Sequence, residues 1–328
     1  METAPRPRRR WRSIALVALG VTFGLIAAQF TGSPAVGQWR SLEGRAAYDG
    51  AYDEAMRSLP PPTMTRDMAV RQGVVRVYAW TSPDHAGTTP VLLLPGRTSG
   101  TPMWAEQVTA LAAARDVYAV DALGDAGRSS QIVPLNSFAD QATWVVDTLD
   151  GLGLPAVHLV GHSFGGATAA EVAQAHPERV ASLTLLEPVF TLAHPPASLF
   201  WWATVAMLPV PQSWRDHALA RIGGVSVEEV RTDDPMSRMI ALGAEHYAAA
   251  LPTPSVRTDD DLSALTMPTY VAVAERDSLA GGEKATDRAR LIPRGRVEVW
   301  PDTTHSLPMQ VGTALTDRLA TWWDSLEP

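Results

Sequence analysis

The 328-residue chain contains no cysteine, which excludes disulfide bonds and metal sites built from thiolates. It also lacks an excess of positive charge, because 27 Lys and Arg stand against 35 Asp and Glu, a formal net charge of -8. Basic residues cluster only at the extreme N-terminus, so no nucleic-acid-binding surface is expected. We find no phosphate-binding loop, dinucleotide fingerprint, metal-ligand cluster or internal repeat, so no cofactor and no metal is implied.

Long hydrophobic runs are equally scarce, and the one that stands out lies near the N-terminus. An uncharged apolar run from Ile14 to Phe30 follows five arginines between Arg6 and Arg12. As a helix, this run would be about 25 Å long, at the short end for crossing a bilayer. We expect an uncleaved signal anchor that holds the chain to the membrane, with the arginines in the cytoplasm and the rest outside. The alternative is a cleaved signal peptide and a secreted protein.

The remaining chain divides into two parts. Residues 35–64 are polar, with a helical pattern, and end in the proline run 60–62, so we interpret them as a helical arm or linker between residues 1–34 and the rest. Residues 65–328 form one larger unit, and 46% of the whole chain is apolar, which is enough for a sizeable core.

Short apolar runs alternate with helical patterns from about residue 65 onward. This alternation predicts an α/β fold with a mostly parallel sheet and helices on both of its faces. Helices are expected near residues 104–113, 138–152 and 315–326, and the expected strands are 74–80, 91–94, 117–120, a strand beginning at 157, 183–186, 270–274 and 297–300.

The most informative motif is VHLVGHSFGG, over residues 157–166. An apolar strand ends in Gly161, Ser163 follows, and Gly165 opens a helix rich in small residues. A sharp strand-to-helix turn of this kind exposes a serine oxygen for nucleophilic attack, and the two glycines are needed where the turn leaves no room for a Cβ atom. We predict Ser163 as a catalytic nucleophile.

From about residue 67 to residue 326 the chain resembles the α/β-hydrolase family, and among its members the serine esterases and lipase-like hydrolases. The matching segments are GHSFGG, the glycine loop after Leu94, DALGDAGRSS, HPERVASLTLLEP, AERD and TTHSLP. The resemblance implies an eight-stranded-type sheet and catalytic residues in the order nucleophile, acid, histidine.

That order puts the other two catalytic residues downstream of Ser163. His305 lies in a turn-rich segment after the last expected strand, and its imidazole is expected to act as general base. Asp277 in AERD resembles the family's acid and is expected to orient His305. Glu187, which follows an earlier strand where some members of the family keep their acid, is the alternative.

The resemblance also implies an oxyanion hole made by the backbone N–H groups of Arg97 and Phe164. The sequence departs from the family at this point, because Pro95-Gly96 stands where members typically have His-Gly. Since the donors are backbone groups, we expect the hole to be retained.

The segment from about residue 188 to 262 is too long for an ordinary crossover and is expected to form a helical cap. Its first part is rich in aromatic residues, including Phe190, Phe200, Trp201 and Trp202. These side chains either pack the cap onto the sheet, line an apolar acyl pocket, or face a nearby bilayer.

Together these features predict a serine hydrolase that cleaves a hydrophobic carboxylic ester through an acyl-enzyme intermediate, without a cofactor. The expected partners are a small ester and, through the N-terminal helix, a membrane. Carbon-carbon bond hydrolases and cofactor-free haloperoxidase-like members share the serine nucleophile and stay open. A non-catalytic binding protein on the same fold is the alternative from another class.

Overall fold

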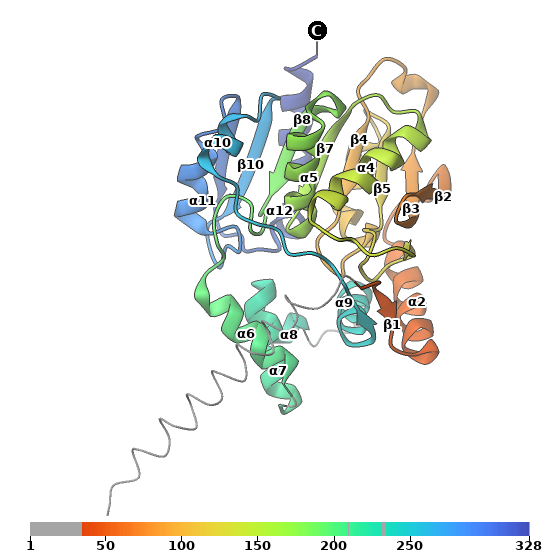
Figure 1. Ribbon diagram of the computed structural model, residues 1–328, viewed down its shortest axis with the longest axis vertical. Helices are drawn as coiled ribbons and strands as arrows, with labels where there is room; N and C mark the ends of the chain where they lie inside the picture. The colour runs from red at the N-terminus through yellow and green to blue at the C-terminus, as the bar shows by residue number, and fades with distance from the viewer. Residues whose placement is uncertain (1–34, 209, 231–233, 328) are drawn as a thin grey trace, which may run out of the picture.

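The computed structural model describes residues 35–208, 210–230 and 234–327. A twisted sheet lies between helices on both faces, and a further group of helices stands at one end of the sheet (Figure 1). The predicted helix over Ile14–Phe30 and the arginines before it lie outside these residues. Of the helices that the structure does describe, none combines the length and apolar character that crossing a membrane requires.

The sheet is mostly parallel, as predicted. In spatial order its described strands are β11 (Gly295–Trp300), β10 (Thr269–Ala274), β8 (Val180–Leu186), β7 (Val157–His162), β4 (Val91–Leu94), β5 (Val117–Val120), β3 (Gly73–Trp80) and β2 (Met64–Val70), with the short β6 (Ser130–Gln131) beside β3. Pairs from β11 to β5 are parallel, whereas β3 runs antiparallel to β5 and to β2. Strand β2 was not predicted from the sequence, because this edge strand is largely exposed and does not have the apolar pattern of a core strand.

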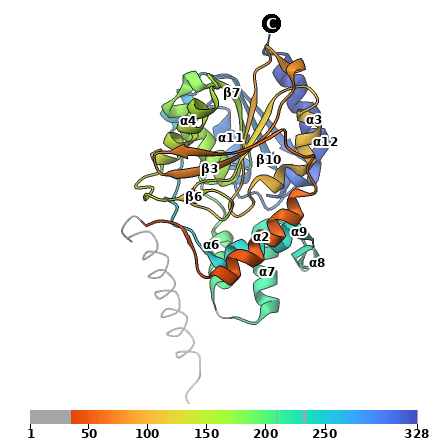
Figure 2. The same ribbon diagram turned by 90° about the vertical axis from the view of Figure 1, so that its right-hand side faces the viewer.

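Helices cover both faces of the sheet (Figure 2). One face carries α4 (Ala139–Leu152), α5 (Phe164–Ala175) and α11 (Gly282–Ala289), and the other carries α3 (Ala105–Leu111) and α12 (Leu307–Asp324).

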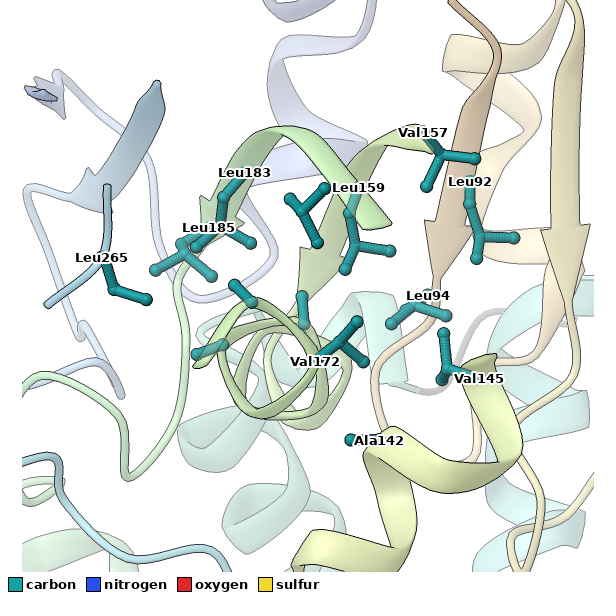
Figure 3. Packing of buried hydrophobic residues seen from close by; sticks show 14 of the residues in the cluster. Leu92, Leu94, Ala142, Val145, Val157, Leu159, Val172, Leu183, Leu185 and Leu265 are labelled. Carbon is teal, nitrogen blue, oxygen red and sulfur yellow. The ribbon is translucent and has the colours of Figure 1, made fainter. Parts of the chain in front are cut away.

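Strand β4 has the sequence VLLL, which is apolar throughout because both faces of the strand are buried. Leu92 and Leu94 pack into one core, where they lie near Val145 of α4 and Val172 of α5 (Figure 3), while the two other residues of β4 pack into the core on the opposite face.

The segment before the sheet packs against the same body. In α2 (Leu42–Met56), Tyr48 and Tyr52 are buried, and the Tyr52 hydroxyl donates a hydrogen bond of 3.0 Å to Oδ1 of Asp121. The short β1 (Gln38–Trp39) pairs with β9 (Tyr247–Ala248). Residues 35–64 therefore form part of the packed structure.

The inserted helices stand at the carboxyl ends of the parallel strands (Figure 1). They are α6 (Ala197–Met207), α7 (Gln212–Gly223), α8 (Val227–Val230) and α9 (Pro235–His246), and we refer to them together as the cap. Helix α9 packs against α2. The chain then returns to the sheet through α10 (Asp259–Ser263), and the short turns η1 (Pro83–His85), η2 (Thr101–Trp104) and η3 (Pro177–Arg179) complete the described elements.

A buried histidine lies inside β7, at the opposite end of the sheet from the cap. His158 Nδ1 lies 2.8 Å from the hydroxyl of Ser182, and its Nε2 lies 3.2 Å from a carboxylate oxygen of Glu327. Its ring stacks on Trp323 with a centroid distance of 4.9 Å. Burial lowers the pKa of His158 to about 4, although the hydrogen bond with Glu327 acts in the opposite direction.

This depressed pKa predicts a loss of stability in weak acid. The unfolded chain binds a proton at His158 near pH 6.5, whereas the folded chain does so only near pH 4, so falling pH favours the unfolded state. Between pH 7 and pH 5, His158 should account for about 2 kcal/mol of lost unfolding free energy. In His158→Gln, this loss should be smaller by that amount in urea titrations at the two pH values.

The matched control is His176→Gln, since the His176 side chain is 39% exposed. It should lose the same unfolding free energy as the parent between the two pH values. An equal loss in His158→Gln and the parent would mean that burial does not hold His158 neutral.

Candidate active site

Ser163 stands at the turn between β7 and α5, with φ 54° and ψ -117°. A backbone in this region is strained for any residue other than glycine, and it lifts the side chain clear of its neighbours. A Cβ atom on Gly161 would lie 2.2 Å from the carbonyl oxygen of Gly165, and one on Gly165 would lie 2.3 Å from the carbonyl oxygen of Leu94. The structure thus gives both glycines the steric role that the motif predicts.

His305 is brought to Ser163 from the loop between β11 and α12. Its Nε2 lies 2.9 Å from Oγ of Ser163, and its Nδ1 lies 3.1 Å from Oε2 of Glu187. A carboxylate only accepts hydrogen bonds, so Nδ1 carries the proton that it donates to Glu187. In the neutral ring Nε2 is then the acceptor, and the hydroxyl of Ser163 donates to it.

Glu187 comes directly after β8 and has a positive φ of 48°. Its side chain is fully buried. Besides His305, four groups at the end of β10 and just after it donate to its two oxygens: the N–H of Ala274 at 2.7 Å, the hydroxyl of Ser278 at 2.7 Å, and the N–H groups of Leu279 at 2.9 Å and Ala280 at 3.3 Å. These contacts hold the carboxylate in one orientation.

The electrostatic balance at Glu187 favours its charged form. Burial by itself raises the pKa of this carboxyl group. The hydrogen bond and positive charge of His305, together with the bonds from Ala274 and Ser278, outweigh burial and leave the pKa below the ordinary glutamate value. Glu187 is therefore an anion at neutral pH.

Asp277, which sequence analysis favoured as the partner of His305, does not occupy that place. Its side chain is 47% exposed, and Oδ1 lies 3.8 Å from a guanidinium nitrogen of Arg221 in the cap. The loop after β10 bends at Asp277, where φ is 46°, and turns this carboxyl group outward. The next three residues, Ser278 to Ala280, face Glu187 instead. The preference for Asp277 was wrong, and the alternative, Glu187, is the carboxylate on His305.

The loop after β4 lies beside Ser163. A Cβ atom on Gly96 would lie 3.4 Å from Cβ of Ser163. In this loop the N–H of Gly96 donates to Met103, that of Thr98 to Asp125 and that of Ser99 to the carbonyl of Gly96. Among the described hydrogen bonds, the N–H of Arg97 is not a donor. Helix α5 begins at Phe164, whose N–H has no acceptor within the helix. The predicted donors Arg97 and Phe164 thus come from the two segments that flank Ser163.

Sequence analysis gave no role to His162, the residue before the nucleophile. Its Nε2 donates a hydrogen bond of 2.9 Å to the backbone carbonyl of His305, and the two rings lie 5.0 Å apart. Burial and the nearby charge of His305 lower the pKa of His162 to about 3, so this imidazole stays neutral. The signal available in the sequence was its place in the Gly-His-Ser motif, but only the structure reveals its partner.

The cap contacts the same histidine loop. The hydroxyl of Ser306 donates a hydrogen bond of 2.8 Å to the carbonyl of Gly223 at the end of α7. Gly224 has φ 66° and lies so close to Thr304 that a Cβ atom there would be 2.5 Å from Cβ of Thr304. Within the part of the chain that the structure describes, no group of three or more His, Asp or Glu side chains is arranged to hold a metal ion.

Known proteins are similar to this chain in sequence and in structure. A model of the α/β hydrolase fold family matches residues 89–223. Carboxylesterase YbfK of Bacillus subtilis is 25% identical over 283 residues, which cover 83% of this chain and 92% of that protein.

Solved structures are similar over most of the chain. The crystal structure of carboxylesterase CesB (YbfK) covers 85% of this chain and 98% of its own, with a TM-score of 0.77 and 23% identity. Naproxen esterase (carboxylesterase NP) of Bacillus subtilis covers 86% and 99%, with a TM-score of 0.77 and 22% identity. A bacterial membrane phospholipase A covers 97% and 99%, with a TM-score of 0.67 and 17% identity. Together with the elbow at Ser163 and the strand order of the sheet, these similarities show that the chain has the α/β-hydrolase fold.

Proposed function

We propose that the protein hydrolyses carboxylic esters, with Ser163 as nucleophile, His305 as general base and acid, and Glu187 as the acid that orients His305. The observation that carries this proposal is the continuous hydrogen-bonded connection from Ser163 through His305 to a buried carboxylate, with distances of 2.9 Å and 3.1 Å. The relatives named as carboxylesterases agree with this reaction.

The reaction follows from the geometry. Oγ of Ser163 attacks the ester carbonyl carbon while its proton moves to Nε2 of His305. The N–H groups of Phe164 and Arg97 donate hydrogen bonds to the carbonyl oxygen and stabilise the negative charge that develops on it. When the tetrahedral intermediate collapses, the departing alcohol takes the proton from Nε2 and leaves an acyl-enzyme. A water molecule then attacks the acyl group by the same steps and releases the acid.

Glu187 and His162 support His305 in different ways. The anionic Glu187 keeps the proton on Nδ1 and stabilises the imidazolium ion that forms during attack. His162 holds the backbone of the histidine loop through its hydrogen bond to the His305 carbonyl, which makes it a positioning residue. Its neutral state avoids placing a second positive charge beside the imidazolium.

The aromatic residues near the site favour an apolar substrate. Phe164 packs edge-on against Phe138 at 5.6 Å, and Phe190, shortly after Glu187, lies 6.2 Å from Phe200 of α6. An ester with an apolar acyl or alcohol group would bury surface against such rings.

The nucleophile is tested by covalent labelling. A fluorophosphonate reacts with a serine that is activated by a histidine, so it should add one phosphonyl group to Ser163, detected by mass spectrometry of the intact protein and its peptides. Ser163→Ala should not be labelled and should lose about a thousandfold or more in ester turnover. A folded parent protein that stays unlabelled would support a non-catalytic binding protein instead.

The identity of the acid is tested by two matched substitutions. Glu187→Gln should lower kcat on a chromogenic ester about 10³- to 10⁴-fold, because a glutamine amide does not stabilise the imidazolium and can favour the wrong tautomer. Asp277→Asn makes the same chemical change at an exposed carboxylate and should change kcat less than about twofold. Both variants should first be checked for folding by circular dichroism. The reverse ranking of the two variants would reinstate Asp277 as the acid.

We further propose that residues 14–30 anchor the protein in a membrane and leave the described residues on the extracytoplasmic side. The apolar run, the arginines before it and the similarity of the described fold to a membrane phospholipase A support this arrangement. In fractionated cells the protein should sediment with membranes, and protease added to spheroplasts should digest it. A chain that is protected until the spheroplasts are lysed would contradict this topology.

A further inference from the structure

The first part of the cap differs in composition from the rest of the protein. Residues 188–214 include no Asp, Glu, Lys or Arg, whereas 19% of the whole chain is charged. Within this stretch, α6 has the sequence ASLFWWATVAM. A helix on the surface of a water-soluble domain normally has charged residues on its outer face, and a helix that is apolar all round normally meets an apolar partner.

This part of the cap is nevertheless exposed. Trp201 in α6 is 60% exposed, and Leu208, the residue directly after this helix, is 40% exposed. Phe200 is 41% exposed, and Trp214, in the first turn of α7, is 62% exposed. We call these four side chains the apolar cap face. Single exposed apolar residues are common, but four large ones in α6, directly after it and in the first turn of α7, two helices that pack together, indicate a contact surface.

Two features of the molecule indicate a lipid surface as the partner. The first is where the chain enters the described structure. The N–H of Gly37 donates a hydrogen bond to Gln131, and β1 pairs with β9, which follows the cap helix α9. The chain therefore enters at the same end of the molecule as the cap, and the C-terminus lies at the other end (Figure 1). The 34 residues before the described part contain the apolar run that we propose as an anchor.

The second feature is the chemistry of the apolar cap face. Tryptophan has a large apolar ring and one N–H donor, and it is enriched where lipid chains meet the headgroups. Trp201 and Trp214 make up the most exposed part of this face. A bilayer at this end of the molecule would cover their rings and leave their N–H groups among the headgroups.

We propose that the apolar cap face rests on the surface of the lipid bilayer, so that the cap and the active site below it face the membrane. The described part of the protein then has two attachments to lipid, the N-terminal run and the cap. An apolar substrate could pass from the bilayer to the site under the cap without crossing water.

The absence of cysteine allows a direct test on the full-length chain in vesicles of phosphatidylethanolamine and phosphatidylglycerol. The substitution Leu208→Cys introduces a single cysteine, which is labelled with an environment-sensitive fluorophore. The control is Leu291→Cys, because Leu291 is 39% exposed and lies in the turn before β11, at the edge of the sheet away from the cap. The two positions thus carry the same residue type with nearly equal exposure at opposite ends of the protein.

The label at position 208 should shift its emission to the blue when the protein is placed in vesicles, and lipids brominated on their acyl chains should quench it. The label at position 291 should show neither effect. Equal emission and equal quenching at the two positions would overturn the proposal.

The same labelled protein in detergent distinguishes other partners of this face. A blue shift at position 208 that grows with protein concentration, without quenching by lipid in vesicles, would assign the face to a second copy of the chain. A shift that is independent of concentration and unaffected by lipid would assign it to a segment of the same chain. Either result would overturn the proposal, and since no catalysis is measured, the proposed ester hydrolysis would be unaffected.

Discussion

The arrangement of the active site depends on one buried carboxylate. Glu187 accepts hydrogen bonds from His305 and from four groups at the end of β10 and just after it, and so joins the ends of β8, β10 and β11. Removing a carboxylate from water costs free energy, and the five hydrogen-bond donors around Glu187 compensate for its lost hydration. The carboxylate that we propose to orient His305 thus also fixes the loops around it.

Two adjacent strands, β7 and β8, are each followed directly by a residue with a strained backbone. Ser163 after β7 and Glu187 after β8 both have positive φ, and the N–H of Ser163 donates to the carbonyl of Leu186, the residue before Glu187. Strain of this kind is retained only where the surroundings determine it strongly. Here the close approach of Gly161 to Gly165 and the hydrogen bonds on Glu187 do so, and Ser163 and Glu187 are held at the ends of two neighbouring strands.

The cap and the sheet follow different physical rules. The sheet lies between two apolar cores, and Ser163, His305 and Glu187 at its carboxyl end are positioned by hydrogen bonds. The first helix of the cap, α6, lacks charge, and α6 and the start of α7 leave large apolar side chains exposed, although Ser306 and Thr304 contact the end of α7 from the histidine loop. The cap is therefore attached to the loop that contains His305. The apolar cap face is suited to apolar surroundings.

The amino-acid sequence was sufficient to predict the α/β alternation, the turn at Ser163 and His305 as a candidate, because these rest on apolar periodicity, glycine sterics and the order of residues along the chain. It did not reveal β2, whose exposed residues lack a core pattern, or the hydrogen bond between His162 and the His305 carbonyl. The choice between Glu187 and Asp277 as the partner of His305 required the folded structure. Both residues follow an apolar strand in the sequence, and both adopt positive φ in the structure. Neither the local sequence nor the backbone conformation therefore distinguishes them. The choice rests on which carboxylate meets the donors of Ser278, Leu279 and Ala280, a contact across some 90 residues of chain that no local pattern encodes.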